Sequence, residues 1–237
     1  YILFYSLTDF HRMPRQEAPL EYLQRFIPAV SVPQTLQLLH QYKVHLTITR
    51  NRKSVLGDYR HADGQQAHRI SVNGDLNKYA FLITLLHELA HLVTFENHGH
   101  EVLDHGQEWK YYYAHLLRLS LAAAIFPADL RGALEQSLHN PPASSCSDET
   151  LMRQLKKYDQ HSGDSVWMET LPEGALFHTG DGKMFRKGKQ LRKRFQCEEV
   201  GTGLLYLFHP LHEVNSVAPA RFEEASNTQR QSGSSGK

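Results

Sequence analysis

The segment that most constrains the fold is a long apolar run near the middle of the chain. Residues 79–93 are apolar at nearly every position, yet they include His87, Glu88 and His91. Apolar residues on almost every face indicate a helix buried in the core, and we expect it to span residues 76–95. Burying two imidazoles and a carboxylate without partners would cost several kcal/mol. These side chains are therefore expected to share a partner, such as a metal ion.

The spacing of the three residues is that of a metal site on one helix. His87 and His91 are four positions apart, so both imidazoles lie on one face and can reach a single ion at about 2.0–2.1 Å. Glu88 is rotated by about 100° from His87. Its carboxylate is therefore expected beside the ion, where it can accept a proton from water.

A catalytic zinc site needs a third protein ligand and an open fourth position. His105 is the favoured third ligand, because it directly precedes Gly106 at the start of a helix expected over residues 107–124. A glycine at that point lets the chain turn back toward the first helix. The other candidates in this part of the chain are His98, His100, Glu101, Asp104 and Glu108.

The composition excludes several other classes of protein. The chain has 16 histidines but only two cysteines, Cys146 and Cys197, which excludes a disulfide framework and a zinc site made of four cysteines. The longest apolar run, residues 79–86, is far shorter than the roughly 20 residues that cross a bilayer, so no membrane partner is expected. The first residues do not resemble a signal peptide, and the expected location is the cytoplasm.

The pattern along the chain indicates an α+β fold. Two short helices are expected over residues 19–30 and 33–42. A three-stranded sheet should follow, formed by residues 44–49, 55–60 and 67–72. The last of these strands is the candidate for a sheet edge that pairs with an extended substrate.

A linker composition at residues 140–145 and a change of pattern beyond it indicate a second domain. Short strand-like runs separated by glycine turns predict a small antiparallel β domain there. The expected divisions are a first domain over residues 1–140, a linker and short helix over 141–160, the β domain over 161–215 and a disordered tail over 216–237.

The expected β domain contains a basic segment. Residues 183–194 include seven basic side chains and no acidic one, and Phe185 and Phe195 lie within or next to it. Basic and aromatic residues on a β surface suit single-stranded nucleic acid, whereas the alternative is a solvated strand face. The candidate nucleic-acid-binding residues are Arg186, Lys187, Lys189, Arg192, Lys193 and Arg194.

The H-E-x-x-H helix, the loop after it and the His105-Gly106-x-x-Trp109 opening of a second helix resemble the SprT-like zinc metallopeptidases, the family that includes Spartan. The resemblance covers residues 35–120, and residues 206–210 are similar to a bacterial subgroup. It implies a zincin-like fold with one zinc ion bound by His87, His91 and His105, and with Glu88 as general base. In the best-known members it also implies cleavage of proteins bound or crosslinked to DNA. This chain lacks the paired cysteines of the zinc ribbon that many members carry.

The sequence thus predicts a zinc-dependent endopeptidase that hydrolyses peptide bonds with metal-activated water and Glu88 as the base. Its expected partners are a protein or peptide substrate and, through the basic strand, DNA. Two alternatives stay open, namely a general peptidase without DNA dependence and a non-catalytic module, stabilised by zinc, that binds nucleic acid or protein. The oligomeric state is left open.

Overall fold

The chain forms two compact units, Tyr1–His161 and Ser162–Lys237, each with its own core. The linker expected at residues 140–145 and most of the expected tail lie outside the described residues, and the helix expected near residue 150 belongs to the first unit. The computed structural model describes residues 2–4, 16–18, 20–50, 52, 55–138, 148–159 and 165–217.

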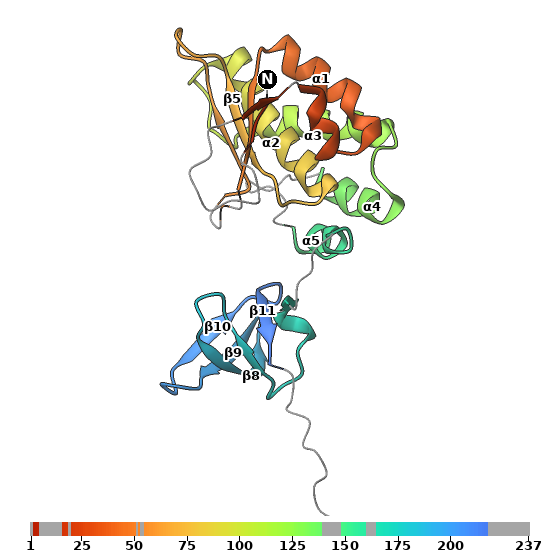
Figure 1. Cartoon of the computed structure of the whole chain (residues 1–237). Coiled ribbons are helices and arrows are strands. Elements are labelled where there is room, and N and C mark those ends of the chain that lie inside the picture. The colour runs from red at the N-terminus through yellow and green to blue at the C-terminus, as the bar shows by residue number, and fades with distance from the viewer. Residues whose placement is uncertain are drawn as a thin grey trace, which may run out of the picture. The chain divides into compact units, whose positions relative to one another are not determined.

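A mixed sheet forms one layer of the first unit (Figure 1). Its strand order is β2-β1-β3-β5-β4, with β4 antiparallel to β5 and the pairs β1–β3 and β3–β5 parallel. The strands are β1 (Ile2–Phe4), β2 (Gln16–Ala18), β3 (His45–Thr49), β4 (Gly57–Arg60) and β5 (Arg69–Asn73). Strands β3, β4 and β5 confirm the expected three-stranded sheet, to which β1 and β2 add two strands.

Strand β5 does not form the sheet edge expected of residues 67–72. It pairs with β3 on one side and with β4 on the other, so its backbone has no free side. The edge next to β5 is β4 instead, and the opposite edge is β2. The alternation of apolar and polar residues identifies strands, but it does not determine their order in a sheet.

The helices of the first unit include one departure from the sequence pattern. The helix expected over residues 19–30 is replaced by two short 3₁₀ segments, η1 (Leu20–Arg25) and η2 (Ala29–Ser31). Pro28 lies between them, and proline disfavours the helical conformation of the residue before it. The α-helices are α1 (Val32–Gln41), α2 (Lys78–His98), α3 (Gln107–Ala122), α4 (Ala128–Ser137) and α5 (Glu149–Lys156).

Helix α2 is the central element of the first unit (Figure 1). It packs against β4 and β5 and also against α3, and it is buried continuously from Ala80 to Ala90. This burial confirms the expected core helix. The helix ends at Gly99, whose φ of 59° lies in the left-handed region that glycine adopts without strain. None of the helices in the described segments combines the length and apolarity of a membrane span.

The second unit is a six-stranded antiparallel sheet with the order β10-β9-β8-β7-β11-β6, as the short strand-like runs predict. Its core contains Phe177, Phe185 and the free thiol of Cys197. The strands are β6 (Ser165–Trp167), β7 (Leu176–His178), β8 (Met184–Leu191), β9 (Arg194–Glu199), β10 (Leu205–Phe208) and β11 (Glu213–Ser216), and a 3₁₀ segment, η3 (Met168–Thr170), follows β6.

Asn77 connects the start of α2 to the end of α5. Its side-chain oxygen accepts hydrogen bonds from the backbone N–H groups of Tyr79 and Ala80. Its amide donates to the Leu155 carbonyl at 3.0 Å and to Asp159 Oδ1 at 2.7 Å. One side chain thus caps the core helix and fixes the last helix of the unit.

We expect Asn77→Ala to destabilise the first unit by about 2–3 kcal/mol, because it removes a helix cap and two further hydrogen bonds. Asp148→Ala is the matched control, since Asp148 caps α5 through a single bond to the Leu151 N–H. The control should cost about 1 kcal/mol. Chemical denaturation followed by circular dichroism measures both. Equal losses would mean that the bonds from Asn77 to α5 contribute nothing.

Candidate metal centre

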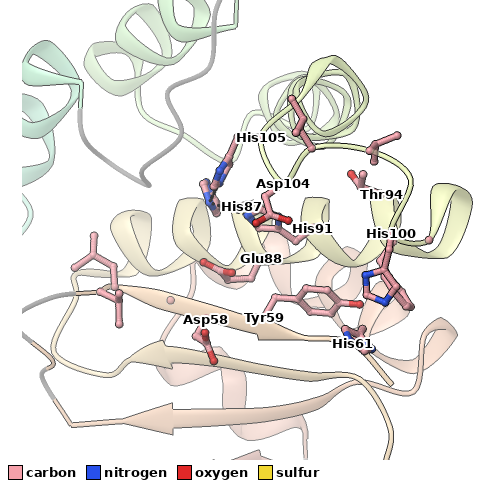
Figure 2. Close-up of a pocket in the computed structure, with 17 residues that line it drawn as sticks. Asp58, Tyr59, His61, His87, Glu88, His91, Thr94, His100, Asp104 and His105 are labelled. Carbon is pink, nitrogen blue, oxygen red and sulfur yellow. Dashed lines mark hydrogen bonds between the residues drawn. The ribbon is translucent and has the colours of Figure 1, made fainter. Parts of the chain in front are cut away.

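Three histidines converge at one end of a pocket in the first unit (Figure 2). His87 and His91 lie on one face of α2, and His105 approaches from the loop that precedes α3. The Nε2 atom of His87 is 3.3 Å from Nε2 of His91 and 3.3 Å from Nε2 of His105. Among the residues that the structure describes, this is the one group of three or more potential ligands close enough to hold a metal ion.

The separation of these nitrogens fits a tetrahedral ion. Two ligand nitrogens that each lie about 2.0–2.1 Å from such an ion are about 3.3–3.4 Å apart. The imidazoles are also neutral at pH 7, as metal ligands must be. Burial, together with His91 and His105, lowers the pKa of His87 to about 3. Burial and His105 lower the pKa of His91 to about 4, and burial lowers the pKa of His105.

Glu88 lies beside the three histidines, and its carboxylate points toward strand β4 (Figure 2). Only 5% of the residue is exposed to solvent. This burial, with a contribution from Asp58, raises the pKa of Glu88 to about 8, and Arg52 acts in the opposite direction. In the metal-free protein the carboxyl group therefore holds its proton more tightly than an exposed glutamate does.

The pocket in front of these residues has a volume of about 680 Å³. It is lined by residues 55–59 on and before β4, by α2, and by the loop that carries His105. One wall is thus a strand that pairs on one side only among the described strands, and the opposite wall carries the histidine cluster. Such a pocket has the shape and the polar groups needed to hold an extended chain against a metal ion.

The family comparison covers this region. Residues 23–124 match the family model described as SprT-like family. This segment is thus similar to the SprT-like family, and we call it the SprT-like domain after that match. The match contains the three converging histidines, Glu88 and β4, and it confirms the expected resemblance. No curated protein and no solved structure matches the chain.

The structure separates His105 from the other candidates for the third ligand. His98 Nε2 lies 3.3 Å from the Tyr112 hydroxyl, outside the pocket. His100 and Asp104 line the pocket but do not belong to the converging group. Glu101 and Glu108 belong neither to the residues that line the pocket nor to the converging group.

Trp109 supports the histidine cluster from the side of α3. Its ring centroid lies 4.7 Å from that of His87, 5.3 Å from that of His91 and 4.6 Å from that of His105. The indole is fully buried. Trp109, which the sequence marks only as part of the motif that opens α3, thus contacts all three imidazoles.

Gly57 is a site residue that sequence reasoning missed. A Cβ atom at this position would lie 2.5 Å from Glu88 Oε1 and 2.7 Å from Thr84 Cγ2. Such distances are far below van der Waals contact, so only glycine lets β4 approach Glu88 so closely. A single glycine within a short strand has many explanations in a sequence, and the fold alone identifies this one.

In the second unit, the structure contradicts one of the predicted nucleic-acid-binding residues. Lys187 is only 4% exposed, and its ammonium group donates to the Met168 carbonyl at 2.7 Å and lies 3.9 Å from the Phe195 ring centroid. It faces the core because side chains alternate along β8. Lys187 therefore stabilises the fold of this unit and is not part of its basic surface.

The other predicted basic residues are exposed. Arg186 lies directly opposite Glu198 on β9, which reduces the local positive charge. Lys189, Arg192, Lys193 and Arg194 gather at the hairpin between β8 and β9. We call these four residues the basic hairpin. Arg192 has a φ of 53°, an uncommon conformation for a residue other than glycine.

We expect Gly57→Ala to destabilise the SprT-like domain by about 1–3 kcal/mol, because the buried helix α2 cannot move away from the added methyl group. Gly132→Ala is the control. Gly132 lies in α4 with no atom near the position of an added Cβ, and alanine there should stabilise the protein by about 1 kcal/mol. Denaturant unfolding measures both changes. A Gly57→Ala protein at least as stable as the wild type would show that Glu88 has room to move.

Proposed function

We propose that this chain is a zinc-dependent endopeptidase with a zincin-like active site. His87, His91 and His105 bind the ion, and Glu88 is the general base. The observation that carries the proposal is the convergence of three neutral imidazoles with a buried carboxylate beside them in one pocket. Three protein ligands leave one tetrahedral position open, as in catalytic zinc sites, whereas structural sites use four.

Each residue of the pocket has its own role in the proposed reaction. Bound zinc would supply Lewis acidity, which polarises a peptide carbonyl and acidifies water. Glu88 accepts the proton of the attacking water and passes it to the nitrogen of the leaving amine. Gly57 leaves the space in which this carboxylate lies. Trp109 packs against the three imidazoles and limits their rotation.

Strand β4 is the proposed site for the substrate backbone. It is an edge of the sheet and borders the pocket. The Asn73 N–H donates to the Leu56 carbonyl, so alternate residues beyond Leu56 turn their backbone groups toward β5. Gly57 and Tyr59 therefore direct theirs toward the open side. An extended peptide that pairs there would cross the pocket in front of Glu88.

The test of the peptidase proposal combines metal content with cleavage of a basic, unstructured protein. The wild type is expected to hold one zinc ion per chain and to cleave. Glu88→Gln should keep the zinc but lose at least about a hundredfold in rate, because the proton acceptor is gone. His105→Ala should lose the zinc, whereas the control His98→Ala should keep both the zinc and the activity.

Each outcome separates one part of the proposal. Full zinc in His105→Ala would contradict the assignment of the third ligand. Unchanged cleavage by Glu88→Gln would remove Glu88 from its role. A wild-type protein that holds zinc but cleaves nothing would favour the non-catalytic zinc-stabilised module.

The substrates that we propose are proteins associated with DNA, held near the enzyme by the basic hairpin. Four cationic side chains at one hairpin can neutralise backbone phosphates, and they are all exposed. The peptidase chemistry does not depend on this part of the proposal, because the hairpin belongs to the other unit.

We expect Arg192→Glu, Lys193→Glu and Arg194→Glu together to weaken binding of single-stranded DNA by at least about tenfold and to reduce the salt dependence by about two units of slope. A triple reversal at Arg25, Arg118 and Arg131, exposed residues of the first unit, changes the net charge equally and should have a much smaller effect. Fluorescence anisotropy over a range of salt concentrations measures both. Equal losses would show that net charge, not the basic hairpin, determines binding.

A further inference from the structure

Strand β4 forms the floor of the pocket beneath α2. Side chains two positions apart on a strand face the same way, so Gly57 and Tyr59 both face the helix. Gly57 lies against Glu88, and the Tyr59 ring lies nearly parallel to the His91 imidazole, with 5° between the planes and 6.5 Å between the centroids. Each of the two α2-facing residues of β4 thus lies next to one polar residue of the proposed site.

The Tyr59 ring is held in place by a chain of hydrogen bonds. The Tyr59 hydroxyl lies 2.9 Å from Nδ1 of His68, and the backbone N–H of Ala62 donates to the same nitrogen. Nδ1 is therefore an acceptor, and the phenol is the donor. The proton of His68 then lies on Nε2, which donates to Glu96 Oε1 at 3.1 Å. His68 is only 7% exposed.

This chain of contacts begins and ends on the same helix. Glu96 and His91 are both on α2, whereas Tyr59 lies on β4 and His68 directly before β5. The path Glu96–His68–Tyr59–His91 therefore closes a loop between the helix and the sheet. Burial and the Glu96 charge raise the pKa of Tyr59, so the phenol keeps the proton that it donates.

The orientation of the His91 ring depends on the side chains that pack against its faces. A histidine that binds a metal usually donates its other ring N–H to a neighbouring acceptor, which fixes the ring. Within the part of the chain that the structure describes, the one hydrogen-bond contact of His91 is at Nε2, the nitrogen that points to His87. The rings of Tyr59 and Trp109 pack against the imidazole. Within the described residues, packing of these two rings is therefore what restrains the orientation of the imidazole.

We propose that Tyr59 is a positioning residue for the metal ligand His91, with its own ring held in place by His68 and Glu96. The inference rests on the proposed function, because it requires that His91 binds a metal ion. It also connects the edge strand to the metal, since Tyr59 belongs to the strand that we assign to the substrate backbone. A shift of β4 would be transmitted to the His91 ring.

The test measures the metal itself in the full chain. We expect zinc to pass from Tyr59→Leu to a chelator about tenfold faster than from the wild type, in keeping with other residues that support a ligand. Tyr59→Phe keeps the ring but loses the hydrogen bond to His68. Its rate of zinc release should lie between those of the wild type and Tyr59→Leu. The visible spectrum of the cobalt(II)-loaded protein should change in both variants. The control is Tyr158→Phe, which removes a 2.8 Å hydroxyl bond to Asp129 elsewhere in the unit and should change neither property.

A second pair of variants tests the chain of hydrogen bonds without touching the ring. Glu96 is exposed, so its replacement is not expected to prevent folding. Glu96→Ala should accelerate zinc loss as Tyr59→Phe does, whereas Glu96→Gln keeps an acceptor oxygen and should restore the wild-type rate. A general loss of stability would not be rescued in this way.

The outcomes distinguish this inference from the proposed function. If the wild type binds zinc and cobalt and Tyr59→Leu releases zinc no faster than Tyr158→Phe, Tyr59 does not position His91 and the zinc site itself stands. If the wild type binds neither metal, the proposed function fails, and the inference fails with it.

Discussion

The burial of α2 is the constraint on which the rest of the structure depends. The helix lies between the sheet and α3, so the side chains on all its faces are fixed by the core. His87 and Glu88, at 4% and 5% exposure, cannot turn to solvent for hydrogen bonds. Their partners must come from the surrounding elements, and His105, Trp109 and β4 are placed to provide them. The geometry of the proposed site thus follows from the way in which the core is packed.

The three imidazoles cannot fully satisfy one another. Each neutral ring nitrogen is either a donor or an acceptor, yet Nε2 of His87 faces two similar nitrogens at 3.3 Å, and its Nδ1 is buried without a hydrogen bond within the described residues. A cation that accepts a lone pair from each Nε2 removes the conflict among the three Nε2 atoms. A bound ion would therefore contribute to the free energy of folding as well as to chemistry.

The parts of the site that depend on local spacing could be predicted from the sequence. Two histidines four positions apart in an apolar helix specify one face, and a histidine before a glycine indicates where the chain turns back. Some residues reach the site only because of the order of the strands in the sheet, and their roles could not be predicted from spacing. Gly57, Tyr59 and His68 acquire their roles because β4, and not β5, is the edge beside α2. Lys187 was assigned to the surface because composition alone does not show which face of a strand is buried.

Several further histidines lie near α2 and its pocket. His61 and His100 pack on Phe95 of α2, and the His68 ring meets the edge of Phe95 near Tyr59. These rings and the three converging imidazoles all lie on or next to α2. Histidine can occupy such positions because the neutral ring packs like an aromatic residue and still offers a nitrogen for a hydrogen bond or a metal. Six of the 16 histidines therefore lie around one helix, whose polar face must be buried and must still offer nitrogen atoms for binding.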